Sequence, residues 1–173
     1  LDIDVLTAAK QRIAKVFDDF PRVYVSFSGG KDSSVMLHLV MEEAIKRDRK
    51  VGVLLVDLEG MYKITIEHIQ AMYDLYADHI EPYWVCLPIR LRNAVSVFEP
   101  RWMCWDPGKE NVCIRQTPPM AITDETFFPF FRRGMEFEEF GPLFGKWDGG
   151  GKLTACFVGI RSDESLNRYR TIK

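Results

Sequence analysis

A glycine-rich turn between a predicted strand and a predicted helix constrains this chain more than any other feature of its sequence. Residues 22–27 form a dense apolar run, which predicts a buried strand, and residues 28–33 then read SGGKDS. A helical pattern begins directly after Ser33, so the first N–H groups of that helix have no partner within it. Because these donors and the positive end of the helix dipole face the turn, the turn is predicted to bind an anion, most often a phosphate.

Each residue type in the turn suits such a site. Gly29 and Gly30 lack a Cβ atom, so the backbone can take positive φ and approach a ligand closely. Lys31 adds a positive charge, and the hydroxyls of Ser28 and Ser33 add hydrogen-bonding groups. The competing interpretation is a plain strand-to-helix turn that happens to be rich in glycine and serine, since such a turn is a weak motif without its context.

The rest of the chain supplies that context, because predicted helices and strands alternate along it. Further strands are predicted at residues 51–56, 83–87 and 153–160, and helices at residues 1–20, 34–45 and 62–80. This alternation predicts a three-layer, Rossmann-like α/β fold with a doubly wound, mainly parallel sheet in the strand order 3-2-1-4. The 173 residues are expected to form one domain, 1–173, and the chain is interpreted as part of a longer protein with further strands after Lys173.

The alternation is lost between residues 88 and 152, a stretch rich in proline and aromatic residues. A short helix is predicted there over Phe130–Phe140. Several arginines are interleaved with Trp102 and Trp105, a mixture that suits single-stranded nucleic acid. However, the net charge of −2 gives no general attraction to nucleic acid or to anionic membranes, and glutamates at 136, 138 and 139 offset the arginines. The favoured interpretation is therefore a lid-like insertion over a ligand site.

Three polar loops that contain glycine each follow a predicted strand, at residues 28–33, 57–60 and 159–165. Because parallel strands place their carboxyl ends at one edge of the sheet, and ligands bind there, the loops are expected to converge on one site. The spacing excludes a Walker A loop and a dinucleotide fingerprint, which need GxxxxGK[ST] and GxGxxG. The convergence favours a phosphate site over a plain turn.

Two of these loops resemble the signatures of a known family. Residues 26–33, SFSGGKDS, resemble the PP-loop of the adenine nucleotide alpha-hydrolase superfamily. Residues 159–165, GIRSDES, together with Arg168 resemble the second signature of phosphoadenosine phosphosulfate (PAPS) reductases and sulfurylases. Similarity to reductase-like regulators related to the immunoglobulin-binding regulator A protein of bacteria and prophages lies in residues 84–89, 93–96 and 104–107.

The resemblance implies a domain that binds ATP or PAPS, with the PP-loop on the phosphates, Asp57 near the adenosine and Arg161 near the sulfate, phosphate or ribose. It implies catalytic roles for Lys31, Asp32 and Arg161. The residues expected to bind the nucleotide are Ser26, Ser28, Gly29, Gly30, Lys31, Asp32, Ser33, Asp57, Glu59, Gly159, Arg161, Asp163, Glu164, Ser165 and Arg168. Cleavage between the α and β phosphates also calls for Mg²⁺, which Asp32 or Glu59 is expected to help hold.

The chain departs from the family pattern in two places. After Asp57 the family commonly has threonine and glycine, whereas here Leu58 and Glu59 stand before Gly60. PAPS reductases also carry a nucleophilic cysteine in a C-terminal tail, and nothing in this chain matches it. The first departure concerns contacts to the nucleotide, and the second concerns the reaction itself.

The cysteines that are present do not fit a reductase. They include no CxxC pair, so a structural zinc site is not expected, and reduced packing thiols in a cytoplasmic protein are the favoured interpretation. A reductase needs an exposed thiolate with a lowered pKa, whereas Cys86 and Cys156 lie in predicted buried strands. The other two, Cys104 and Cys113, lie in the irregular insertion.

The favoured function is therefore binding of an adenine nucleotide with α/β-phosphate cleavage of ATP or adenylyl transfer. One alternative is a thiol-dependent PAPS reductase whose cysteine tail lies outside this chain. Another is a non-catalytic, nucleotide-sensing transcriptional regulator that binds nucleic acid through the arginine and tryptophan segment. No apolar run approaches the ~20 residues of a membrane-spanning helix.

Overall fold

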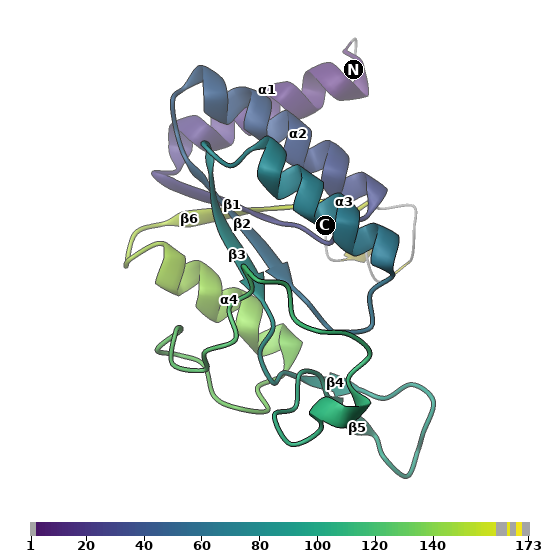
Figure 1. Ribbon diagram of the computed structural model, residues 1–173. Helices are drawn as coiled ribbons and strands as arrows, with labels where there is room; N and C mark the ends of the chain where they lie inside the picture. Colours follow the sequence, from purple (N-terminus) through teal and green to yellow (C-terminus); the bar gives the residue numbers. More distant parts are fainter. Residues whose placement is uncertain (1–2, 162–165, 167–168, 171–173) are drawn as a thin grey trace.

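Four parallel strands form the central sheet of the computed structural model, which describes residues 3–161, 166, 169 and 170 (Figure 1). In sheet order these strands are β3 (Ile80–Val85), β2 (Val51–Val56), β1 (Arg22–Ser26) and β6 (Thr154–Val158). Three helices cover one face: α1 (Val5–Asp19), α2 (Lys31–Lys46) and α3 (Lys63–Leu75). The opposite face carries α4 (Phe137–Asp148).

The predicted three-layer α/β fold and the strand order 3-2-1-4 are confirmed. Both β1 and β2 are buried on both faces, as their unbroken apolar sequences require in a parallel sheet covered by helices. Gly52 of β2 pairs with Tyr24 of β1, and a Cβ atom on Gly52 would lie 3.0 Å from the Cβ atom of Tyr24. The small residue there lets the large ring of Tyr24 fit beneath α4.

The fourth strand is less buried than its sequence predicts. A buried strand was expected over residues 153–160, but β6 ends at Val158, and Leu153 and Cys156 are exposed. Within the described residues β6 pairs only with β1, so one of its long edges lacks a neighbouring strand. An apolar run therefore marks the strand correctly but does not say whether the strand is central or at the edge.

The predicted helix over Phe130–Phe140 is wrong in position, because α4 begins at Phe137 and runs to Asp148. A capping box starts the helix: Glu136 accepts from the backbone of Glu139, and the Glu139 side chain accepts from the Glu136 N–H. Before it, Gly134 has φ +76°, a conformation that a helix does not contain. The phenylalanines before this turn are spaced so that they extend the apolar pattern of α4, and the predicted helix therefore starts too early.

Those phenylalanines form the core between α4 and the sheet. The ring of Phe128 makes edge contacts with Trp147 and Phe140, at 5.0 and 5.4 Å between ring centroids, and Tyr83 of β3 packs on Phe144 at 5.0 Å. At the end of α4, Arg22 donates to Asp148, whose side chain is only 1% exposed. Part of the irregular insertion thus forms the second layer that covers the sheet.

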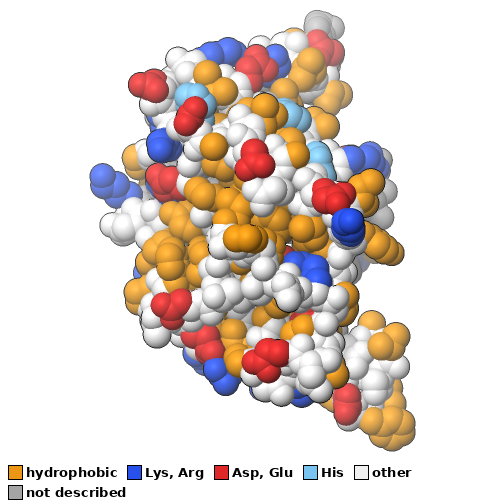
Figure 2. Space-filling view, viewed as in Figure 1, with side chains coloured by type: hydrophobic (Ala, Val, Ile, Leu, Met, Phe, Trp, Pro, Cys, Tyr) orange, Lys and Arg blue, Asp and Glu red, His pale blue; other side chains and the backbone are white. Residues whose placement is uncertain are grey.

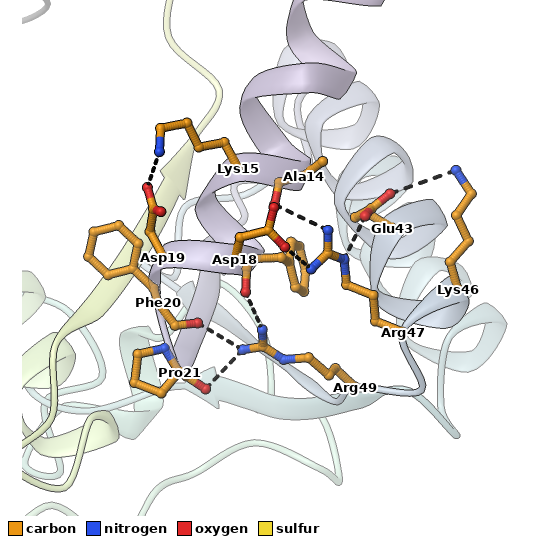
Figure 3. A network of polar contacts seen from close by, with 11 residues as sticks. Ala14, Lys15, Asp18, Asp19, Phe20, Pro21, Glu43, Lys46, Arg47 and Arg49 are labelled. Carbon is orange, nitrogen blue, oxygen red and sulfur yellow. Dashed lines mark hydrogen bonds and ion pairs between the residues drawn. The ribbon is translucent and has the colours of Figure 1, made fainter.

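Two arginines join α1 to the loop after α2 (Figure 3). Arg47 pairs with Asp18 of α1 at 2.5 Å, and Arg49 donates to the carbonyl oxygens of Phe17 and Pro21, at 2.8 Å each. The Arg49 guanidinium also lies over the Phe17 ring, 4.9 Å from its centroid. These contacts hold the end of α1 against the C-terminal end of α2, opposite the end that begins at the glycine turn.

The remainder of the insertion projects from the carboxyl edge of the sheet. A hairpin of β4 (Arg90–Arg92) and β5 (Arg101–Met103) carries the projection, and a 3₁₀ turn, η1 (Glu110–Val112), follows it. Val95, Val97 and Phe98 at its tip are 86–96% exposed, and Figure 2 shows orange side chains at the projecting end. Among the described residues, no helix has the length and apolar character needed to cross a membrane.

Candidate functional site

The glycine turn has the geometry of an anion-binding loop. Gly29 has φ +72°, and a Cβ atom there would lie 2.7 Å from Cγ1 of Ile69 and 2.9 Å from Cγ2 of Thr65 on α3. Gly30 has φ −79° and is the N-cap of α2, so positive φ is needed at only one of the two glycines. The helix begins at Lys31, not after Ser33 as expected, because the chain turns directly into the helix at Gly30.

Serine hydroxyls hold the turn in shape. Ser34 Oγ donates to the Gly30 carbonyl oxygen at 2.9 Å, and Ser33 Oγ lies 3.0 Å from both that oxygen and Ser28 Oγ. Ser34 Oγ also lies 2.8 Å from Nε2 of His68, which joins the turn to α3. Because the hydroxyls are used within the turn, an anion would be held chiefly by the backbone N–H groups at the start of α2.

The loop after β6 lies directly against the start of α2. A Cβ atom on Gly159 would be 2.9 Å from the backbone nitrogen and Cα of Ser33, so only glycine allows this approach. The approach brings Arg161 beside the helix: its Nε lies 3.9 Å from Asp32 Oδ2, while Lys31 Nζ lies 2.7 Å from Asp32 Oδ1. The three residues predicted to be catalytic therefore lie together.

The rest of the second signature falls outside the described residues. It comprises Asp163, Glu164, Ser165 and Arg168, whose predicted roles in nucleotide binding stay predictions. Ser26, at the end of β1, lies one residue before the apolar Phe27 that leads into the turn. The structure thus brings the described part of both signatures to one edge of the sheet.

Asp57 has a role that sequence reasoning missed. Its side chain is fully buried, and it accepts hydrogen bonds from Trp84 Nε1 at 2.8 Å and from the Glu59 N–H at 2.9 Å. The guanidinium of Arg115 pairs with both of its carboxylate oxygens, and Trp105 Nε1 donates to its carbonyl oxygen at 2.6 Å. Asp57 therefore ties the insertion to the end of β2, and its expected contact with adenosine stays a prediction.

Glu59 makes a second set of contacts with the insertion. It has φ +68°, and its carboxylate accepts from the backbone N–H groups of Trp105 at 2.8 Å and Ile114 at 3.1 Å. Arg115 Nε donates to the Glu59 carbonyl oxygen at 3.2 Å. Both carboxylate oxygens are thus engaged, and the expected binding of nucleotide or Mg²⁺ by Glu59 stays a prediction. No local signal in the sequence links Arg115 to Asp57, because the two residues are 58 positions apart and the burial of Asp57 appears only in the fold.

The arginines of the insertion are largely paired with acids. Arg132 donates to Glu139 at 2.7 Å, and Arg101 donates to Glu136 at 3.0 Å. Arg133 contacts a further glutamate, at position 125. This pairing lowers the positive potential available to a polyanion, and a nucleic-acid partner stays a prediction.

All four thiols are poor nucleophiles in this structure, because the pKa of each is raised. Burial raises the pKa of Cys86 well above its usual value and raises the pKa of Cys104 to about 11. The pKa of Cys113 is also raised, by burial first and then by the nearby Glu59. Cys156, expected in a buried strand, lies on the edge strand β6 and is exposed, although partial burial of its thiol still raises its pKa. The described residues contain no thiol with a pKa lowered by its surroundings, as a reductase nucleophile would need.

The segment that contains three of the four strands of the central sheet matches a known family. Residues 22–95 fit the family model described as "Phosphoadenosine phosphosulfate reductase domain", and this segment contains the glycine turn, the Asp57 loop and the first three strands. Over these residues the chain is similar to the PAPS reductase family, and the predicted resemblance is confirmed there. The resemblance to prophage regulators stays a prediction.

A curated relative extends the similarity along the whole chain. It is "Uncharacterized protein YbdN" of Escherichia coli (strain K12), which is 44% identical over 173 residues, covering 99% of this chain and 42% of the relative. The chain therefore spans under half the length of the curated relative that it matches. The match therefore does not assign an activity, a substrate or a partner to the whole protein.

Proposed function

We propose that this domain binds an adenine nucleotide at the glycine turn and acts on ATP between its α and β phosphates, by hydrolysis or by adenylyl transfer. The observation that carries the proposal is the meeting of Lys31, Asp32 and Arg161 at the start of α2, beside a turn that requires glycine at position 29. The similarity of residues 22–95 to the PAPS reductase family makes a nucleotide the expected anion. A plain structural turn does not account for two cationic side chains placed at a helix N-terminus.

The residues present fit a chain of phosphates. The backbone N–H groups at the start of α2 and the helix dipole favour negative charge, and Lys31 and Arg161, at 74% and 51% side-chain exposure, can reach a ligand from either side of Asp32. The described residues contain no group of three or more His, Cys, Asp or Glu side chains that could hold a metal alone. Mg²⁺ would therefore be held by Asp32 together with phosphate oxygens and water, as is common for this ion.

In adenylyl transfer, a nucleophilic oxygen of an acceptor attacks the α-phosphorus of ATP. The bond from that phosphorus to the oxygen that bridges the β phosphate breaks, and pyrophosphate leaves with the electron pair. Negative charge that develops on the phosphate oxygens would be stabilised by Lys31, Arg161 and the helix N-terminus. When water is the acceptor, the same step yields AMP and pyrophosphate. No thiol is needed, which agrees with the raised pKa values of Cys86 and Cys104.

Gly30→Val tests the site without a large cost to the fold. Gly30 has an extended conformation, with φ −79° and ψ 164°, and the nearest atom to an added Cβ is Ser28 Oγ at 3.4 Å. Valine suits this conformation but places two methyl groups in the turn. Gly141→Val on α4 is the matched control, because a Cβ atom there meets nothing within 4 Å.

Calorimetric titration with ATP and with PAPS gives the result. We expect the parent protein and Gly141→Val to bind nucleotide, and Gly30→Val to lose measurable binding while its circular dichroism spectrum is unchanged. Equal affinity in both variants would mean that the phosphates bind elsewhere. Release of pyrophosphate from ATP and Mg²⁺ is then measured across candidate acceptors, and release at background levels throughout would remove the enzymatic part of the proposal.

A further inference from the structure

A cavity of about 440 Å³ opens beside the buried ion pair at the end of β2. Its volume is in the range of small-molecule sites, roughly 300–1,000 Å³. The buried side chains of Cys86 and Trp105 form an apolar part of its wall, and Gln116 and Thr117 contribute polar groups. An apolar wall with a few polar groups is the usual lining of a site for a small ligand.

Acidic side chains determine the charge of this cavity. Asp106, Glu110 and Glu125 line it, and Arg115 is the single basic side chain of the lining. The Arg115 guanidinium is already paired with both carboxylate oxygens of Asp57, a buried residue outside the lining, so the positive charge of Arg115 is neutralised. The cavity therefore presents carboxylates to a ligand and would repel a triphosphate or a sulfonucleotide.

The three carboxylates differ in how far they are compensated. Glu125 contacts Arg133, and Asp106 lies 3.8 Å from Lys109 Nζ. Glu110 forms no ion pair within the part of the chain that the structure describes, and it lies on the exposed turn η1 at the cavity wall. Glu110 is thus the carboxylate best placed to receive a cationic ligand.

We propose that this cavity binds the acceptor, a small organic molecule that carries an ammonium or guanidinium group. The role as acceptor site rests on the proposed function, whereas binding of the cation does not. Cys86 and Pro88 of the lining directly follow β3, and β3 lies two strands from β1, a separation of roughly 10 Å across the sheet. Because a protonated amine has no free electron pair, the cationic group would anchor the acceptor, and a separate oxygen would face the nucleotide.

Three probes and two variants test the inference. Agmatine is a linear dication, adipate is a dianion of similar length, and adenosine is an uncharged nucleoside; each is titrated calorimetrically at low ionic strength. Glu110→Gln removes the uncompensated charge, and Glu138→Gln, an exposed residue in the first turn of α4, is the matched control. We expect agmatine to bind and adipate not to bind. Glu110→Gln should lower the affinity for agmatine about two- to fivefold, and Glu138→Gln should leave that affinity unchanged.

The outcomes separate this inference from the proposed function. Agmatine that binds equally well to Glu110→Gln, or adipate that binds as well as agmatine, would overturn the cationic site. Displacement of agmatine by adenosine would make the cavity the nucleoside site and overturn its role for the acceptor. Loss of ATP binding in Gly30→Val with agmatine affinity intact supports two separate sites. ATP binding without agmatine binding overturns only the present inference.

Discussion

Arg115→Met removes the charge that compensates Asp57 while it keeps a side chain of similar length. Solvent cannot compensate for this loss, because the Asp57 side chain is 0% accessible to solvent and the Arg115 side chain is only 18% accessible. Deleting one partner of a buried ion pair costs roughly 3–5 kcal/mol, since the remaining charge stays buried without compensation. The hydrogen bonds from Trp84 and Glu59 to the carboxylate persist, so we expect the lower end of that range, about 3 kcal/mol.

The assay is urea unfolding followed by tryptophan fluorescence, with thermal unfolding in parallel. A loss of about 3 kcal/mol corresponds to a melting temperature lower by roughly 6–12 °C for a domain of this size. Arg132→Met is the matched control, because the pair of Arg132 with Glu139 is exposed, at 69% and 44%, and should contribute less than about 1 kcal/mol.

A double-mutant cycle isolates the pair. Asp57→Asn combined with Arg115→Met removes both charges, so the double variant should be less destabilised than the sum of the two single variants. If Arg115→Met costs no more than Arg132→Met, or if the two single losses simply add, Asp57 does not depend on Arg115 and the explanation of how the insertion is held is wrong.

Three further predictions concern the turn and the thiols. Gly29→Ala should destabilise the fold more than Gly30→Ala, because only the first glycine has positive φ and a crowded Cβ position; equal losses in urea unfolding would contradict this. The folded pKa of Cys104, about 11, exceeds the ordinary 9.0, so its contribution to stability is complete below pH 9 and is lost as pH rises to 11. Unfolding free energy should fall by about 2–3 kcal/mol more over that interval in the parent protein than in Cys104→Ala, and parallel curves would refute it. A thiol reagent at neutral pH should label Cys113 and Cys156 in the folded protein and the other two cysteines only in urea, and native labelling of all four would count against the buried positions.

Apolar runs and glycine turns were enough to predict the sheet. The strand order and the place of the turn follow from alternation and from the right-handed crossovers that parallel strands require. The start of α4 was less predictable, because phenylalanines from position 127 onward are apolar whether or not they are helical. These phenylalanines pack against α4 and the face of the sheet that it covers, and that packing surface forms only when the chain has folded.

The glycine turn was determined by the sequence itself, because the need for positive φ and for free N–H groups at a helix start is local and depends on a few neighbouring residues. The use of Asp57 and Glu59 was decided by tertiary structure. Both acids directly follow β2, yet the counter-charge of Asp57 and the N–H donors to the Glu59 carboxylate come from residues 105–115 of the insertion. A buried charge needs a counter-charge, and the fold can supply one from a residue far away in the sequence. The sequence around the acid does not indicate which distant residue that is.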